Sequence, residues 1–563
     1  MANTVTDPGP LLGASAPHAG AELGCGTALH WIPGPTPAAF TGDALMTCLR
    51  RVRDPIYVVK SSQPGLLGLA AGGSTRLGAD RSLAPPLPIA AMLAPATPEC
   101  LGDKLFCAEH ELRYAYIAGE MANGISTTRM VSAMAKNGML GFYGAAGLDL
   151  STIDGALTEL RRELNGRGNW GVNLIHLPGH PDDEHKLVDL LLSHGVANVS
   201  ASAFVHLTPA VVRCAAHGLH ADGSGRVVRR VRIFAKVSRP EVATAFMSPP
   251  PRQMLDKLVA RGLLTDTEAH LAARVPVATN VTVEADSGGH TDNRPLMAVL
   301  PTILALRDTL CRKYSYIDTI HVGAAGGLGT PNAIAAAFSL GAAYVLTGSI
   351  NQLAVESGIS PAAKELLAAA DIADVAMAPS ADMFELGVKV QVLRRGTLFA
   401  ARAGQLYEVY RTYPGLDAIP TAVRTKLENQ VLHASFDEIW AQTADFWSLR
   451  DPERLAHAHG DPKSQMALVF RWYLGMSSRW AIEGSPARRS DYQLWCGPAA
   501  GSFNRWIADS FLADAANRSV VQIARNLMNG AALITRANHA RATGVQLPDK
   551  AFRYAPQPVD ISA

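Results

Sequence analysis

The chain has 563 residues, and its 51 Lys and Arg nearly balance its 49 Asp and Glu, which leaves a formal net charge of +2. This balance argues against a strongly basic nucleic-acid-binding protein and against an acidic solvating tail. Hydrophobic residues make up 48% of the chain and charged residues 18%, which excludes a mainly disordered protein. The length predicts roughly two to four domains.

The cysteines and the apolar stretches indicate the compartment. Seven cysteines are scattered without a CxxC pair, so we predict neither a disulfide framework nor a thiolate zinc site. The first residues lack a basic stretch followed by an apolar one, and no stretch approaches about 18 uninterrupted apolar residues. We therefore expect a cytoplasmic protein that contacts neither a membrane nor nucleic acid.

We expect a small appendage over residues 1–105. Residues 1–40 contain six Pro and six Gly without a helical or strand period, which predicts a loose arm. A strand-like run at residues 57–60 follows, and another stretch rich in Pro and Gly comes after it and ends near residue 103.

Over residues 106–237 and 276–355, short apolar runs alternate with segments of helical pattern. Continuous apolar runs are typical of buried parallel strands, and eight such units match a (β/α)8 TIM barrel. A doubly wound open sheet is the alternative. The eight runs are residues 114–118, 139–142, 170–174, 197–202, 231–237, 281–285, 320–323 and 344–347.

The remaining segments are predicted to be helical. Residues 238–275 separate two of the strands and contain a helical stretch, so we expect an inserted lid over the barrel mouth. Residues 356–563, with helical patterns at 467–480 and 518–540, are expected to form a substrate-binding or cap region.

The strand at residues 281–285 runs into two glycines and a histidine. Gly288 and Gly289 would let the backbone approach a flat ligand closely. His290 would point into the barrel mouth as a proton donor or acceptor. A tight turn whose histidine bonds to the backbone is the competing interpretation.

Two small-residue turns follow the seventh and eighth predicted strands, where barrels commonly bind phosphate. Gly326 and Gly327 precede a helix that has Pro331 near its start, and Gly348 and Ser349 end the next strand. Backbone N–H groups at such a helix start bind anions. Ordinary turn glycines are the alternative, and neither turn is a GxxxxGK[ST] loop or a GxGxxG fingerprint.

Small residues lie at the ends of the first and third predicted strands, and one amide, Asn173, lies at the end of the third. The small residues would suit the face of a heteroaromatic cofactor, and the amide would suit its edge. Lys236 lies inside an apolar strand and needs a polar partner there. That partner is either an anionic cofactor atom or a structural carboxylate.

Several long segments of the sequence resemble segments of a known protein family. Examples are YIAGEMANGIS (116–126), EADSGGHTDNRP (284–295), VGAAGGLGTP (322–331), AAYVLTGSINQ (342–352) and MAPSADMFELGVKVQVL (377–393). Over residues 85–545 the chain resembles the nitronate monooxygenase (2-nitropropane dioxygenase-like) family. The resemblance is closer to its PfaD-type branch, the trans-acting enoyl reductases of polyketide and polyunsaturated fatty acid synthases.

This resemblance implies FMN across the barrel mouth and NADPH or NADH as hydride donor, with His290 as the active-site histidine. Glu120 departs from the family's turn, where a small residue is expected, so we expect its carboxylate to point away from the ring. The implied cofactor-binding residues are Gly119 and Met121 at the ring, Asn173 at its polar edge, Lys236 and Glu284 near the ring or ribityl chain, Gly288 and Gly289, and Gly326, Gly327, Gly348 and Ser349 around the phosphate.

The implied reaction reduces an enoyl thioester carried by an acyl-carrier protein. Hydride would pass from reduced FMN to the β-carbon, and His290 is the candidate donor of a proton to the α-carbon. A nitronate monooxygenase, with oxygen as oxidant and the histidine as base, is the first alternative. A non-catalytic docking subunit of a synthase is the second.

An acyl-carrier protein is usually acidic, so a near-neutral chain needs a local basic patch to bind it. The candidate patch surrounds the turn at residues 222–225, and a solvated hairpin is the alternative. The patch residues are Arg226, Arg229, Arg230 and Arg232.

The resemblance is also compatible with a homodimer.

Two other groups are interpreted as structural. Cys496 is expected to be a packed thiol. The second group resembles metal ligands by residue type but opens a helix, where acidic residues favour the dipole. It comprises His180, Asp182, Asp183, Glu184 and His185.

Overall fold

The computed structural model describes residues 29–78, 86–178 and 180–561. The chain divides into two units, Met1–Pro95 with Arg536–Ala551, and Ala96–Thr535 with Phe552–Ala563. Most of the predicted loose arm lies outside the described residues. Its last part differs from the prediction, because residues 29–32 form a strand.

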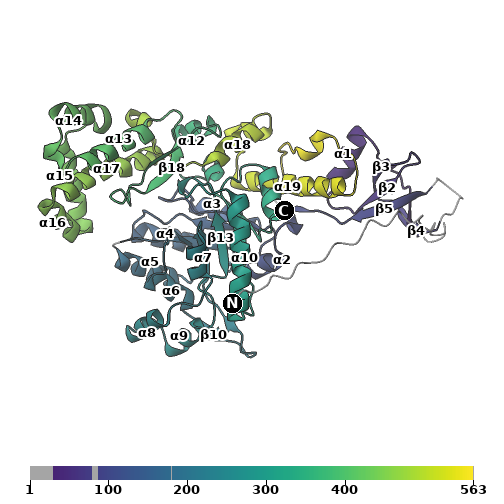
Figure 1. Cartoon of the computed structure of the whole chain (residues 1–563), viewed down its shortest axis with the longest axis horizontal. Helices are drawn as coiled ribbons and strands as arrows, with labels where there is room; N and C mark the ends of the chain where they lie inside the picture. Colours follow the sequence, from purple (N-terminus) through teal and green to yellow (C-terminus); the bar gives the residue numbers. More distant parts are fainter. Residues whose placement is uncertain (1–28, 79–85, 179, 562–563) are drawn as a thin grey trace, which may run out of the picture. The chain divides into compact units, whose positions relative to one another are not determined.

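The first unit contains a five-stranded antiparallel sheet, in the order β3-β2-β5-β1-β4, and a helix that contacts β3 (Figure 1). Trp31, Val59 and Ala70 form a buried cluster in it. The strand predicted at residues 57–60 is present as β2. The elements are β1 (Leu29–Ile32), α1 (Gly42–Arg50), β2 (Ile56–Lys60), β3 (Leu67–Ala71), β4 (Ser74–Leu77) and β5 (Leu87–Leu93).

A C-terminal segment completes this first unit, which the sequence analysis did not predict. Helix α19 (Val520–Ala542) enters the unit at Arg536. The Arg536 side chain is fully buried and donates hydrogen bonds to the carbonyl oxygens of Arg51 and Asp54. No local pattern reports such a contact, because Arg536 and Arg51 are 485 positions apart.

Eight parallel strands close into a barrel in the second unit, in the order β12-β13-β15-β16-β6-β7-β8-β9. The predicted TIM barrel is therefore confirmed, and its closure excludes the open sheet. The strands are almost entirely buried, since helices cover the outside and side chains fill the inside. They are β6 (Tyr116–Ala118), β7 (Leu140–Tyr143), β8 (Trp170–Ile175), β9 (Asn198–Ser202), β12 (Arg232–Val237), β13 (Asn280–Glu284), β15 (His321–Ala325) and β16 (Val345–Thr347).

Helices surround the barrel, and three of them begin at a threonine that caps the first turn. The side chains of Thr127, Thr208 and Thr330 each accept a hydrogen bond from a backbone N–H in the first turn. Proline at the start of α6 and α11 suits that position because it needs no hydrogen-bond acceptor there. The helices are α2 (Lys104–Glu109), α3 (Thr128–Lys136), α4 (Leu150–Glu163), α5 (Pro181–Ser193), α6 (Pro209–Ala216), α7 (Pro240–Phe246), α10 (Leu296–Tyr314) and α11 (Pro331–Ser339).

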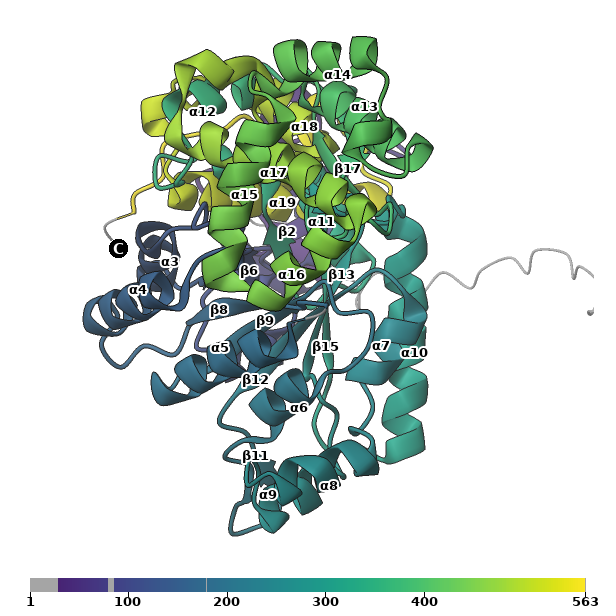
Figure 2. The ribbon, with the colours of Figure 1, turned by 90° about the vertical axis from the view of Figure 1, so that its left-hand side faces the viewer.

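The insertion predicted as a lid lies at the other end of the barrel. Its helices α8 (Arg252–Ala260) and α9 (Asp266–Ala272) contact α6, and α9 contacts β10 (His220–Ala221). Strand β10 pairs with β11 (Val227–Val228) in a hairpin that leads into the amino end of β12. Figure 2 shows α8 and α9 at the bottom of the barrel, far from α13 and α17 at the top. The prediction of a lid over the barrel mouth is wrong.

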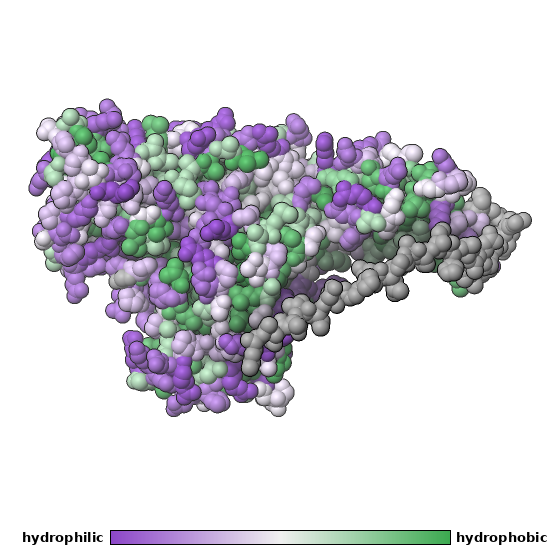
Figure 3. All heavy atoms as spheres, viewed as in Figure 1, coloured by the Kyte–Doolittle hydropathy of each residue, from purple (hydrophilic) through white to green (hydrophobic). Residues whose placement is uncertain are grey.

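The C-terminal part of the second unit covers the carboxyl ends of the barrel strands instead (Figure 2). It is not purely helical, because β17 (Val375–Pro379) and β18 (Lys389–Leu393) form a sheet with β14 (Gly289–His290). The surface over α14–α16 is mostly hydrophilic with scattered apolar residues (Figure 3). The helices are α12 (Pro361–Ala368), α13 (Phe399–Thr412), α14 (Thr421–Leu427), α15 (Phe436–Arg450), α16 (Pro452–Gly460), α17 (Pro462–Glu483) and α18 (Pro498–Ile507).

Within the described part of the chain, none of the helices combines the length and the apolar character that a membrane crossing requires.

Candidate active site

A cavity of about 470 Å³ lies at the carboxyl ends of the barrel strands, where barrels of this kind carry their chemistry. Residues from the end of each barrel strand or from the loop after it line the cavity. The C-terminal part covers it with residues of α17, the segment around Trp495 and the turn between β17 and β18. Most of the predicted site residues therefore meet in one pocket.

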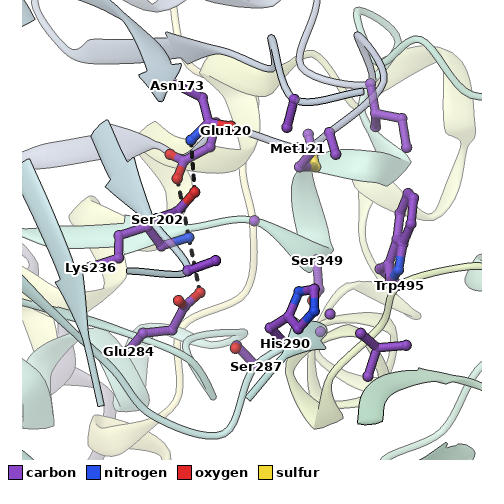
Figure 4. A pocket seen from close by; sticks show the side chains of 18 of the residues that line it. Glu120, Met121, Asn173, Ser202, Lys236, Glu284, Ser287, His290, Ser349 and Trp495 are labelled. Atoms are coloured by element: carbon purple, nitrogen blue, oxygen red, sulfur yellow. Dashed lines mark hydrogen bonds and ion pairs between the residues drawn. The ribbon is translucent and has the colours of Figure 1, made fainter. Parts of the chain in front are cut away.

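Lys236 lies between two carboxylates on one side of the pocket (Figure 4). Its Nζ is 2.9 Å from Glu284 Oε1 and 3.3 Å from Glu120 Oε1. Burial alone would lower the pKa of Lys236, but the charges of Glu120 and Glu284 outweigh burial and raise it above its usual value. The lysine is thus held as an ammonium group, and the cluster carries one excess negative charge.

Glu120, whose carboxylate was expected to point away from the flavin ring, lies in the pocket wall. Its side chain is only 5% exposed, lines the pocket, and accepts a hydrogen bond from Ser200 Oγ at 2.9 Å. Its second oxygen, Oε2, is buried and has no hydrogen-bond partner among the described residues. Lys236, which comes from a strand on the far side of the barrel, pairs with this carboxylate inside the pocket.

The Asn173 amide is fixed at the end of β8. Its Nδ2 donates to Ser202 Oγ at 2.8 Å and to the Ser200 carbonyl oxygen at 3.1 Å (Figure 4). These two bonds orient the side chain toward the neighbouring strand β9 and define where its polar atoms lie in the pocket wall.

The turns after β15 and β16 form a cradle with room for an anion. A Cβ added at Gly327 or at Gly348 would meet no atom within 4 Å, so both positions face open space in the pocket. Gly326 has a φ of +85° and a Cβ there would lie 2.8 Å from the Ala285 carbonyl carbon, so this position requires glycine. Ser349 Oγ lies in the same turn and accepts a hydrogen bond from Gly497 N.

Other polar atoms at the pocket wall also lack partners within the described part of the chain. They are Ser287 Oγ and Gln352 Oε1, in addition to Glu120 Oε2. Buried polar atoms normally find hydrogen-bond partners, so these atoms fit a polar ligand in the cavity. Together with the open cradle, they fit the flat, phosphate-bearing cofactor that the sequence predicts.

His290 lies across the pocket from Lys236, near Ser349 and Trp495 (Figure 4). Its Nε2 is 3.2 Å from Ser380 Oγ and 3.3 Å from Asp382 Oδ1. Burial alone would lower the pKa of His290, but the hydrogen bond and charge of Asp382 outweigh burial and raise it. In return, the pKa of Asp382 falls to about 2, because the His290 interaction outweighs the effect of burial.

Two predicted glycines act through packing. Gly119 does not line the pocket, and a Cβ there would lie 2.4 Å from Leu346 Cδ2. Gly288 does line it, but its missing side chain makes room for Cys496, whose backbone N lies 2.7 Å from the position of a Cβ. The Cys496 thiol is buried and its pKa is raised to about 12 by burial, as expected for a packed cysteine.

Ser380, Asp382, Gln352 and Trp495 line the pocket, and the sequence analysis assigned them no role. Ser380 and Asp382 lie inside the string at residues 377–393, which is one of those that carry the family resemblance. That resemblance was the only feature of the sequence that could have pointed to these two residues. Ser380 is 90 positions from His290, so no local spacing could connect the two.

The arginine patch proposed for an acyl-carrier protein lies away from the pocket, and none of its four residues lines the cavity. Arg226 pairs with Asp318 at 2.8 Å. Arg229 donates to the Pro276 carbonyl oxygen, and burial lowers its pKa to about 10. Because the residues surround the β10–β11 hairpin at the amino ends of the strands, Arg226, Arg229, Arg230 and Arg232 do not form a basic surface at the pocket.

The residues that resemble metal ligands form no metal site: the described chain contains no group of three or more His, Cys, Asp or Glu side chains suited to one. Glu184 lies in the first turn of α5, as predicted. Its side chain is buried and accepts hydrogen bonds from Thr208 Oγ1 and Leu177 N, and it contacts His176 Nδ1 at 2.7 Å. It therefore ties the loop after β8 to the start of α6.

Two family models match the chain. The model for nitronate monooxygenase matches residues 106–425, which is more than half of the chain. The model for the inserted helical domain of [acyl-carrier-protein] S-malonyltransferase matches residues 413–492, in the part that covers the pocket.

Similar proteins come from bacterial polyketide pathways. The chain is 46% identical over 441 residues to the polyketide biosynthesis protein ThaF of Burkholderia thailandensis, and 43% identical over 438 residues to the polyketide biosynthesis protein PksE of Bacillus subtilis. Each match covers 78% of this chain, but 38% of ThaF and 57% of PksE. The chain thus spans less than two thirds of the length of these relatives.

A solved structure is similar over most of this chain. The enoyl reductase domain of MlnA, from the macrolactin biosynthesis cluster of Bacillus amyloliquefaciens, is 40% identical with a TM-score of 0.74. The match covers 79% of this chain and 98% of that chain.

Proposed function

Since the chain belongs to the nitronate monooxygenase family, and within it to the PfaD-type enoyl reductases, we propose that it reduces enoyl thioesters with bound FMN. NADPH or NADH would be the source of the hydride. The observation that carries the proposal is that one pocket brings together His290, the Lys236 cluster and the open glycine cradle.

The residues divide into three groups by the part of the cofactor they would hold. Gly326, Gly327, Gly348 and Ser349 would bind the phosphate through backbone N–H groups and a hydroxyl. Met121, Asn173 and the Lys236 cluster would contact the ring, with the Asn173 amide at its polar edge. When bound, FMN would supply the hydride that adds to the β-carbon of the substrate.

The chain's own contribution to the chemistry would be a proton. The raised pKa of His290 favours the protonated ring, which suits an acid that protonates the α-carbon. The same state is unfavourable for a base that must remove a proton from a nitroalkane. The ion pair of His290 with Asp382 therefore favours the reductase over the nitronate monooxygenase.

The first experiment replaces the histidine. We expect His290→Ala to keep its bound flavin and its reduction by NADPH, because no phosphate-cradle residue changes. We expect the reoxidation of the reduced enzyme by a crotonyl thioester to slow at least 100-fold, within the range that general acid catalysis contributes. Anaerobic stopped-flow absorbance in the flavin bands measures both steps.

Full reoxidation activity in His290→Ala would contradict the role of this residue. A wild-type enzyme that is oxidised by oxygen with a nitronate, but not by the crotonyl thioester, would support the monooxygenase instead. A colourless protein that cannot be loaded with FMN would support the non-catalytic docking subunit.

We also propose that the substrate is delivered on an acyl-carrier protein, which the polyketide names of ThaF and PksE and the match at residues 413–492 support. A carrier protein would dock near the pocket, and the hairpin arginines do not line that pocket. The homodimer and the cytoplasmic location stay predictions.

A further inference from the structure

The loop between β17 and β18 brings a serine and an aspartate to the ring of His290. The pairing of His290 with Val390 joins β14 to β18, and the pairing of Ala378 with Val390 joins β18 to β17. Ser380 and Asp382 follow directly after β17 and therefore lie beside the histidine. Strands β17 and β18 belong to the segment after the barrel strands, whereas β14 follows β13, so the barrel alone does not contain the whole arrangement.

The hydrogen bonds fix which nitrogen of the ring carries a proton. Ser380 Oγ donates to Asp382 Oδ1, so its single proton is already used and the oxygen can only accept from His290. The Nε2 atom of His290 must therefore be the donor to Ser380, and it is also the atom that approaches Asp382. Nδ1 then remains as the ring nitrogen whose proton can be given away.

We infer that Ser380 and Asp382 are positioning residues that hold the His290 ring through Nε2–H and keep it in the charged form, ready to donate from Nδ1. This inference rests on the proposed reductase function. The proton would move from Nδ1 to the α-carbon while hydride from the reduced cofactor bonds to the β-carbon, which together saturate the double bond. The neutral ring would then take a proton from water before the next turnover.

Asp382 is the carboxylate best placed to hold this charge, because the other charged groups near β14 have their own partners. Its side chain is 44% exposed and that of His290 is 34% exposed, so solvent weakens the interaction between the two charges. Glu284 pairs with Lys236, Asp286 accepts from Asn293 and Gln391, Asp292 pairs with Arg239, and Lys389 is exposed on β18.

The test uses Asp382→Asn, which keeps the shape of the side chain and removes its charge. In the flavin-loaded full chain, the His290 titration is followed by NMR of 13Cε1-labelled histidine, with the signal identified by its absence in His290→Ala. We expect Asp382→Asn to lower the titration midpoint by about one unit. Asp382→Glu, which restores the charge, should recover at least half of that shift.

The same variants are then tested by single turnover. Since His290 would lose its proton at a lower pH, the reoxidation of reduced Asp382→Asn by a crotonyl thioester should slow at least 5-fold at pH 8 and less than 2-fold at pH 6. Its flavin content and its reduction by NADPH should match the wild type. Ser380→Ala should slow reoxidation at both pH values, because it removes an orienting contact without removing the charge.

A His290 titration midpoint that is unchanged in Asp382→Asn would overturn the inference. So would a loss of reoxidation that is equal at pH 6 and pH 8. Full turnover by His290→Ala would instead refute the proposed acid of the reaction, and it would do so whatever the Asp382 variants show. The NMR titration separates the two cases, because it reports the pairing without any turnover.

Discussion

At the scale of single residues, the pocket combines glycines that leave space with charged side chains that are held in pairs. Gly327 and Gly348 leave the cradle open, whereas Gly119 and Gly288 permit close packing of Leu346 and Cys496. At Lys236 a side chain fills the pocket wall instead of leaving space. Its buried charge is tolerated because two carboxylates compensate it. The identity of a residue thus does not reveal whether it serves a ligand or the fold.

The cradle leads to a prediction for one glycine. We expect Gly348→Asp to weaken FMN binding at least 10-fold, because its carboxylate would lie in the space of the phosphate and repel its charge. Gly348→Asn adds a side chain of the same size without the charge and should bind more tightly than the Asp variant. Fluorescence titration of the apoproteins with FMN measures both constants. Equal affinity of both variants and the wild type would contradict the phosphate assignment.

At the scale of elements, the two ends of the barrel carry different parts of the structure. The carboxyl ends carry the pocket, and the segment after β16 covers it with α17, α18 and the turn between β17 and β18. The amino ends carry the β10–β11 hairpin and the inserted helices α8 and α9. The insertion is therefore part of the scaffold and has no direct contact with the site.

Helix α9 offers a test of that division. Thr265 and Glu268 form a capping box, and Glu268 also accepts a hydrogen bond from Gly218 N at 2.6 Å. Removing the hydroxyl in Thr265→Ala should lower the free energy of unfolding by about 1 kcal/mol. Urea unfolding measures this effect.

The matched control is Asp256→Ala, which removes an exposed pair with Arg252 on α8 and should change stability by less than about 0.5 kcal/mol. Neither variant should change the flavin content or the KM for an enoyl thioester. A several-fold rise in KM in Thr265→Ala would restore the lid hypothesis.

At the scale of the whole molecule, the two units differ in what they contribute. All residues that line the pocket belong to the second unit, and the first unit combines residues from both ends of the chain. The buried Arg536 is bound there by the carbonyl oxygens of Arg51 and Asp54. We therefore expect the second unit to keep its pocket without the first unit.

A deletion tests this separation. We expect a chain that lacks residues 1–95 to bind FMN with the affinity of the full chain, because its pocket keeps every lining residue. It should unfold at a lower temperature and be less soluble, since residues 536–551 lose the sheet that they pack with. Flavin titration and thermal unfolding measure the two effects. A flavin affinity that falls 10-fold or more would show that the first unit supports the site.

Local patterns in the sequence determined the barrel and much of the pocket. Uninterrupted apolar runs predicted all eight barrel strands, because a strand covered on both faces must be apolar along its length. The position of Gly326, Gly327, Gly348 and His290 directly after strands was sufficient to bring them together, because parallel strands end at the same face.

Only the tertiary structure decided the contacts between segments that are far apart in the chain. The pairing of β14 with β18 brings Asp382 to His290, and the closure of the barrel turns Glu120 inward to Lys236. The same holds for the insertion, whose place at the amino ends is set by its packing on α6 and β10. Such contacts depend on register and on the burial of distant faces, and sequence spacing does not encode either of these locally.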